Sequence, residues 1–166
     1  MKKALFVIDA QEVSFGENHA EFFQYDKGLL SVINQVIDDN KDNLVIYIRN
    51  LMKKNLINKF APFHAYDGSK EAELAQGLHI VSDNVFDKYV GDAFSNKQLD
   101  EFLKKNNVDE IEIIGADGGG CVPLTAMGAR KAGYTVTVNA KAVGTMMKAK
   151  AEKYNTKLKE MGVKFI

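Results

Sequence analysis

The chain has 166 residues, of which 46% are hydrophobic, and its 22 basic and 22 acidic side chains give a formal net charge of zero. This length suits one domain with a single core, residues 1–166, and the balanced charge argues against nucleic acid or an anionic membrane as a partner. The single cysteine cannot form an internal disulfide, which favours a reducing cytoplasm. The apolar run at residues 4–8 is too short for a signal peptide or a membrane span.

Short, continuous apolar runs recur along the chain and are separated by amphipathic stretches. They predict strands over residues 4–8, 44–48, 84–88, 110–114, 134–138 and 163–166. Because the runs are continuous rather than alternating, each strand is expected to be buried on both faces, as in a parallel sheet covered by helices. The sequence therefore predicts an α/β fold: a single-domain, three-layer, doubly wound fold with a six-stranded parallel sheet.

Four helices are predicted from apolar spacing and capping signals: within residues 27–40, after Ser95, over residues 121–132 and near residues 148–161. Gln98 follows Ser95 by three residues, which has the form of a capping box. The long connection over residues 49–83 is expected to contain a short helix at residues 69–76. Connections of this length are often functional lids.

Three reactive side chains fall at the predicted carboxyl ends of strands, where open α/β sheets place their ligand crevice. Asp9 ends the first strand, Lys88 ends the third, and Cys121 follows the fourth after a glycine-rich turn. Each has an ordinary alternative role: a hydrogen-bond acceptor, a solvated cation and a small buried hydrophobic residue, respectively. Their coincidence at one edge of the sheet favours a shared catalytic site.

The turn before Cys121 reads Gly115-Ala116-Asp117-Gly118-Gly119-Gly120. A helix that begins at Cys121 offers free N–H groups and a partial positive charge. With a nearby Lys88 ammonium, this setting is expected to favour the thiolate, and the N–H groups are suited to stabilise an oxyanion. A phosphate cradle is the alternative for such a turn, but the G-x-G-x-x-G pattern is absent.

Three segments together resemble the isochorismatase-like cysteine hydrolases. The segment Val7-Ile8-Asp9-Ala10-Gln11 resembles the family's opening D-x-Q signature, Asp87-Lys88-Tyr89 resembles its lysine segment, and Gly115 to Ala126 resembles its nucleophile segment. These segments occur in the family's order and approximate spacing over most of the chain. The resemblance implies a six-stranded parallel sheet and an Asp-Lys-Cys triad.

The resemblance also implies an unusual cis peptide between Ala116 and Asp117, with the backbone N–H groups of Asp117 and Cys121 in the oxyanion position. Gln11, from the signature, and Phe15, close behind Asp9, are further candidates for substrate binding. Members commonly form oligomers, so a homo-oligomer is expected.

The chain departs from the family's common pattern at three places. Gly118-Gly119 stands where many members carry Thr-Asp, and Lys141-Ala142 stands where many carry Asp-Ala. The Asp-x-His metal segment of nicotinamidases is not matched by Arg49-Asn50-Leu51, and the histidines His64 and His79 form no recognisable metal pattern. We therefore expect neither a metal nor a cofactor.

The expected function is a cofactor-independent cysteine hydrolase that cleaves a small amide or N-carbamoyl substrate through a thioester. Isochorismatases proper cleave a vinyl ether and lack the cysteine, so Cys121 argues against that reaction. The alternative is a non-catalytic small-molecule binding or assembly module that retains the fold, which Gly118-Gly119 and Lys141 favour. A thiol redox protein is less favoured because the chain has no second, resolving cysteine. The candidate pocket residues also include Phe60, Phe63 and Phe94.

Overall fold

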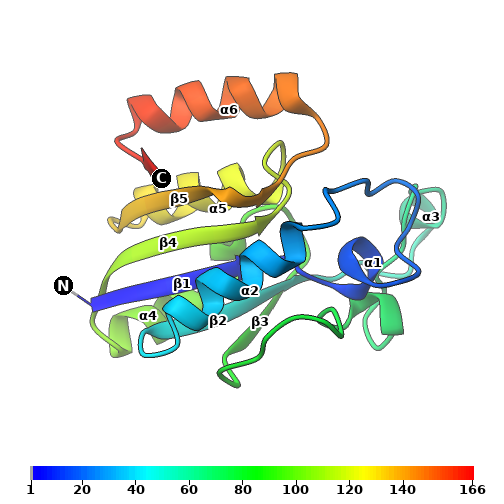
Figure 1. The fold of residues 1–166 in the computed structure, drawn as a ribbon, viewed down its shortest axis with the longest axis horizontal. Coiled ribbons are helices and arrows are strands. Elements are labelled where there is room, and N and C mark those ends of the chain that lie inside the picture. The colour runs from blue at the N-terminus through cyan, green and yellow to red at the C-terminus, as the bar shows by residue number, and fades with distance from the viewer. Residues whose placement is uncertain (1) are drawn as a thin grey trace.

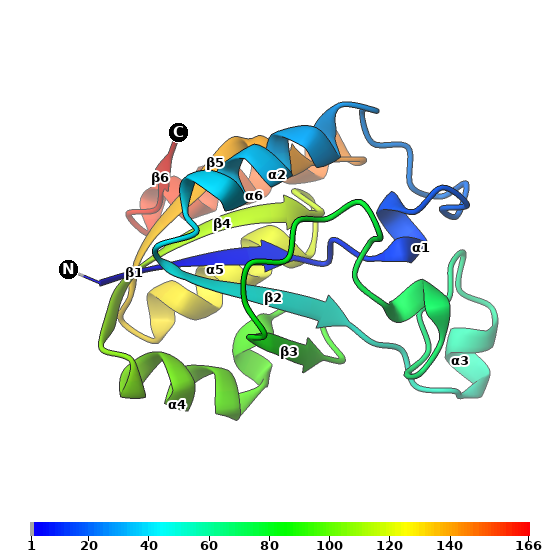
Figure 2. The ribbon, with the colours of Figure 1, turned by 60° about the horizontal axis from the view of Figure 1, so that its bottom comes forward.

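The computed structural model describes residues 2–166 and contains a six-stranded sheet between two layers of helices (Figure 1 and Figure 2). All paired strands run parallel, in the order β3-β2-β1-β4-β5-β6. The strands are β1 (Lys2–Ile8), β2 (Leu44–Asn50), β3 (Val85–Lys88), β4 (Val108–Ala116), β5 (Thr135–Gly144) and β6 (Lys164–Phe165). The predicted α/β fold with its six-stranded parallel sheet is confirmed.

The helices are α1 (Glu12–Phe15), α2 (Leu29–Asp39), α3 (Leu56–Lys59), α4 (Lys97–Lys105), α5 (Cys121–Lys131) and α6 (Lys148–Glu160). Two short 3₁₀ turns lie at Lys70–Ala72 and Ala93–Ser95. Within residues 2–166, no helix combines the length and hydrophobicity needed to span a bilayer.

The central strand β1 shows why the strand sequences are continuously apolar. Phe6 packs in the cluster that contains residues of α4 and α5, whereas Leu5 and Val7 pack in the cluster that contains residues of α2. All three side chains are fully buried. Alternate residues of the strand thus face two different helical layers, and a polar residue on either face would lose its water.

Glycine is required where β1 and β4 approach each other at the site edge. Gly115 has a φ of +110°, and a Cβ there would lie 2.1 Å from the carbonyl oxygen of Ile8. Any other residue would force apart the two strands that carry Asp9 and the turn before Cys121.

The start of α4 differs from the prediction. The N-cap is Asn96, whose side chain accepts a hydrogen bond from the Gln98 amide at 3.0 Å. Ser95 belongs to the preceding 3₁₀ turn, and its hydroxyl donates to the carbonyl oxygen of Asp92. The predicted Ser95–Gln98 capping box is therefore wrong, because Asn96 supplies an equally good cap one residue later.

The loops after the strands contain elements that the sequence pattern did not reveal. The helices α1 and α3 are each a single turn, too short for apolar periodicity to show. The predicted helix at residues 69–76 is only the 3₁₀ turn at Lys70–Ala72. These loops gather beyond the carboxyl ends of β1 and β2, at the end of the sheet opposite the N-terminus (Figure 2).

Candidate active site

Asp9, Lys88 and Cys121 converge at the carboxyl edge of the sheet. Asp9 directly follows β1 in a left-handed conformation with a φ of 51°, Lys88 ends β3, and Cys121 begins α5. The Lys88 Nζ lies 3.0 Å from the Asp9 Oδ2 and 3.2 Å from the Cys121 Sγ. One ammonium group therefore contacts both of the other reactive groups.

The ion pair between Lys88 and Asp9 is withdrawn from water. The exposed fractions of the two side chains are 0% and 14%, respectively. Burial alone would lower the pKa of Lys88, but the Asp9 carboxylate and the Cys121 sulfur raise it above its usual range. The lysine is therefore held in its charged form beside the carboxylate.

Burial raises the pKa of Asp9 above the usual range, and the Lys88 ammonium opposes only part of that increase. Such a carboxylate is a stronger base than an exposed aspartate, and its negative charge is balanced by the Lys88 ammonium. Its Oδ1 atom is buried and makes no hydrogen bond within the described residues. That oxygen is free to accept a proton.

The expectation that the site favours a thiolate is wrong for the free protein. Burial and the Asp9 carboxylate raise the pKa of Cys121 to about 12, although the Lys88 ammonium acts in the opposite direction. The sulfur is therefore a neutral thiol at neutral pH. Its conversion to a nucleophile requires a base, and the neighbouring Asp9 carboxylate is placed to be that base.

The turn between β4 and α5 has the backbone arrangement that the resemblance implies. The peptide bond between Ala116 and Asp117 is cis. The Asp117 carbonyl oxygen accepts hydrogen bonds from the amides of Gly120 and Val122 at 2.9 and 3.2 Å. Among residues 2–166, the amides of Asp117 and Cys121 find no protein acceptor. Both N–H groups are thus available to a ligand atom.

A cavity of about 340 Å³ opens over these groups. Asp9, Ala116, Asp117 and Cys121 line its reactive end. The size is in the range of small-molecule sites. The reactive sulfur therefore faces a space that a small substrate can enter.

A protein-family model, the isochorismatase domain, matches residues 3–166. The chain belongs to the isochorismatase family. This membership supports a hydrolase of amide type. A comparison with curated proteins finds no match.

Solved structures of isochorismatase-like hydrolases share the fold. PnC1 from L. infantum in complex with nicotinate is 22% identical, with a TM-score of 0.86 over 99% of this chain and 92% of that chain. N-carbamoylsarcosine amidase from Thermoplasma acidophilum is 22% identical, with a TM-score of 0.84 over 99% and 95% of the two chains. The pyrazinamidase of Pyrococcus horikoshii in complex with zinc is 24% identical, with a TM-score of 0.80 over 100% and 99%.

The family's nicotinamidase-type metal site does not fit the residues of this chain. Arg49, at the end of β2, donates two hydrogen bonds to the carboxylate of Asp87 and one to Glu73. His79 contacts Asp38, and His64 contacts the backbone of α3. Across residues 2–166, no three His, Cys, Asp or Glu side chains gather as metal ligands would.

The Asp117 carboxylate holds three separate segments together at the site. It accepts hydrogen bonds from the Gly119 amide at 2.6 Å, the Met146 amide at 2.8 Å and the Tyr25 hydroxyl at 3.1 Å. These contacts fix the turn whose N–H groups face the cavity. The sequence analysis missed Tyr25, because it lies in an irregular segment with no periodic signal.

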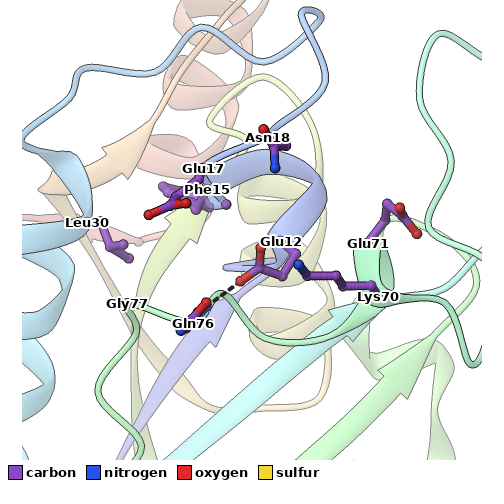
Figure 3. Close-up of a pocket in the computed structure, with 10 residues that line it drawn as sticks. Glu12, Phe15, Glu17, Asn18, Leu30, Lys70, Glu71, Gln76 and Gly77 are labelled. Carbon is purple, nitrogen blue, oxygen red and sulfur yellow. Dashed lines mark hydrogen bonds between the residues drawn. The ribbon is translucent and has the colours of Figure 1, made fainter.

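Phe15 does not line the cavity, contrary to expectation. Its ring stacks on Tyr25, with the ring centroids 5.2 Å apart. It lines instead a separate hollow with Glu12, Leu30 and Gln76, where the Glu12 carboxylate accepts a hydrogen bond from the Gln76 amide (Figure 3). Phe15 ends the short helix α1 and packs on Tyr25 rather than lining this cavity, so its proximity to Asp9 in sequence is misleading. Phe60 and Phe94 also lie outside the cavity lining, whereas Phe63 belongs to it.

Gln11 lines the cavity, but its amide is already engaged. Its Nε2 donates to the carbonyl oxygens of Ala72 and Asn50, and its Oε1 accepts from the Asn50 amide at 2.7 Å. Gln11 therefore ties the end of β2 and the 3₁₀ turn to the residues after β1.

Two of the three departures from the family pattern, at Gly118-Gly119 and Lys141-Ala142, lie outside the contacts among the three reactive groups. A Cβ at Gly118 would lie 2.3 Å from the Thr145 Oγ1, so glycine is the residue that fits here. Lys141 is exposed and does not line this cavity. Neither position disturbs the contacts of Lys88 with Asp9 and Cys121.

Proposed function

We propose that this protein is a cofactor-independent cysteine hydrolase that cleaves a small amide or N-carbamoyl substrate through a thioester on Cys121. The observation that carries the proposal is the placement of the Lys88 Nζ within 3.2 Å of both the Asp9 Oδ2 and the Cys121 Sγ. Asp9 and Cys121 of this cluster line a cavity of small-molecule size, beside two backbone N–H groups that have no acceptor within residues 2–166.

In the acylation step, Asp9 takes the proton of the thiol as the sulfur attacks the carbonyl carbon. The carbonyl oxygen becomes an oxyanion, which accepts hydrogen bonds from the backbone N–H groups of Asp117 and Cys121. Asp9 then gives its proton to the departing nitrogen as the C–N bond breaks. The products of this step are ammonia or an amine and an acyl group bound to Cys121 as a thioester.

In the deacylation step, Asp9 removes a proton from water, which attacks the thioester carbonyl. The C–S bond breaks, the sulfur regains a proton through Asp9, and the acid leaves. Lys88 remains protonated throughout, and its charge stabilises the developing thiolate and orients Asp9. This role agrees with the raised pKa of Lys88.

A screen of amides and N-carbamoyl compounds, read by ammonia release, tests the proposal. The panel includes nicotinamide, pyrazinamide, benzamide and N-carbamoylsarcosine, and each compound is tested with the native protein and with Cys121→Ala. We expect release with at least one compound and a loss of at least about 10⁴-fold in the variant, because no other group is placed to attack. Full hydrolysis by Cys121→Ala would overturn the mechanism. Binding without any hydrolysis would indicate the non-catalytic module instead.

A further inference from the structure

The cavity that Asp9 and Cys121 line is also lined by a cluster of aromatic rings, which form one wall. Phe22, Phe23 and Phe63 line the cavity together with Tyr25. The Phe23 ring centroid lies 4.7 Å from that of Phe63 and 5.9 Å from that of Tyr25, and Phe22 lies 5.2 Å from Phe23. This wall is built by residues outside the strands and helices, and it lines the same cavity as the reactive sulfur.

The ionisable groups around the cavity disfavour a charged acyl group. The lining contains the carboxyl groups of Asp9 and Asp117, whereas its one ammonium, on Lys150, is exposed and lies 5.9 Å from the centroid of the Tyr154 ring. Lys88 does not line the cavity and is already paired with Asp9. An anionic group would lose its water and face two carboxyl groups without a buried cation.

A cationic group would find no unpaired carboxylate. The Asp9 carboxylate is paired with Lys88, and the Asp117 carboxylate already accepts hydrogen bonds from Tyr25, Gly119 and Met146. Two lining oxygens make no hydrogen bond within the described residues: the Asp9 Oδ1, which must stay open to take the thiol proton, and the Asn50 Oδ1, which belongs to an uncharged amide. The remaining lining residues are mostly apolar and include Val13, Ala65, Met146 and Met147. Such a lining stabilises nonpolar surface and offers little to replace the hydration of a charge.

We infer that the acyl pocket selects a neutral, nonpolar acyl group, so that carboxylate-bearing and ammonium-bearing amides are poor substrates. This inference rests on the proposed function and names the substrate class for it. The reactive end then recognises the carboxamide, and the aromatic wall recognises the hydrocarbon attached to it. Each methylene group that becomes buried against the wall should raise kcat/KM about fourfold, until the cavity is filled.

Three compounds of similar size and different charge test the inference directly: 3,3-dimethylbutanamide, its cationic isostere betaine amide and the anion succinamate. We expect kcat/KM for the neutral amide to exceed that for each charged amide by at least about tenfold. A second series, from acetamide through propanamide and butanamide to hexanamide, should show rising kcat/KM. Preference for either charged compound, or no dependence on chain length, would overturn the inference.

Two phenylalanine substitutions form a matched pair for the second series. Phe63→Ala should flatten the dependence of kcat/KM on chain length, whereas Phe60→Ala should leave it unchanged, because Phe60 is 79% exposed and outside the cavity. Phe22→Ala, at a half-exposed residue of the same wall, repeats the test if Phe63→Ala does not fold. Equal slopes in the wild type and in the folded wall variants would contradict the role of the wall.

Protection of Cys121 from iodoacetamide by the same amides separates this inference from the proposed function. The modification is carried out at mildly alkaline pH and followed by peptide mass. Protection requires that the amide binds but not that it is turned over. Selective protection by neutral amides without ammonia release would retain the pocket inference and overturn the hydrolase. Hydrolysis with the opposite charge preference would retain the hydrolase and overturn the pocket inference.

Discussion

The reactive groups and the aromatic wall of the candidate active site are built in different ways. Asp9, Lys88 and Cys121 stand at the ends of two strands and the start of a helix, and Lys88 fixes their arrangement through two direct contacts. The aromatic wall comes from loop residues, and its rings range from buried Phe23 to half-exposed Phe22. Under the proposed function, the regular elements of the fold would place the reactive groups, and the loops would select the acyl group.

The largest expected effect is on turnover in Asp9→Asn. The amide cannot take the thiol proton, and burial, the largest cause of the raised pKa of Cys121, still opposes ionisation of the thiol in the variant. We expect kcat to fall about 10²- to 10⁴-fold while the protein remains folded. Steady-state ammonia release and circular dichroism provide the two measurements. Unchanged turnover would exclude Asp9 as the base.

Lys88→Met should lower stability as well as activity. The variant leaves the Asp9 carboxylate without its cation in a site where Lys88 itself is fully buried. The free energy of unfolding should fall by about 3–5 kcal/mol, as measured by urea denaturation. Lys104→Met is the matched control, because Lys104 pairs with Asp100 on the surface and should cost less than about 1 kcal/mol. Similar losses in the two variants would contradict the importance of the buried pair.

Tyr25→Phe should have a moderate effect, because it removes one of three donors to the Asp117 carboxylate. The turn remains held by two amides but less firmly. We expect kcat to fall about tenfold with little change in KM. Tyr154→Phe, outside the cavity lining, is the control and should behave like the wild type. A change in KM alone would show that the hydroxyl acts on substrate binding instead.

The smallest expected effect is a displacement of the acid limb of the pH profile. Only the ionised form of Asp9 accepts the thiol proton, and burial raises its pKa above the range of an exposed aspartate. Activity should therefore be lost as pH falls through this raised value, at a higher pH than the value near 4 of an exposed aspartate. In Lys88→Met, the limb should move to still higher pH, because the cation that opposes the increase is gone. A limb that stays in place would mean that another group titrates.

The sequence predicts the reactive groups of the cavity better than it predicts the aromatic wall. Apolar runs locate the strand ends near which Asp9, Lys88 and Cys121 lie, and the segments around these residues resemble those of one family. The structure brings these three residues into contact. The expected thiolate was nevertheless wrong, because the desolvation of Cys121 depends on tertiary packing that sequence spacing does not report.

The wall could not be predicted in the same way. Phe22 and Phe23 lie in an irregular segment between α1 and α2, where no period indicates the direction of a side chain. Phe15 was placed in the site from its proximity to Asp9, but the single turn of α1 directs it to Tyr25. Phe63 was chosen correctly as a possible lining residue, whereas Phe60, three residues earlier, is largely exposed.

Identification of the residue that carries the acyl group during turnover tests directly whether Cys121 forms a thioester. The protein is mixed with the amide that it hydrolyses fastest, quenched in acid within one turnover, digested and analysed by peptide mass. We expect the mass of the acyl group on the peptide that contains Cys121, and we expect hydroxylamine, which cleaves thioesters, to remove it. An acyl group on a different residue would contradict the thioester mechanism. So would hydrolysis that leaves Cys121 unmodified and proceeds equally fast in Cys121→Ala.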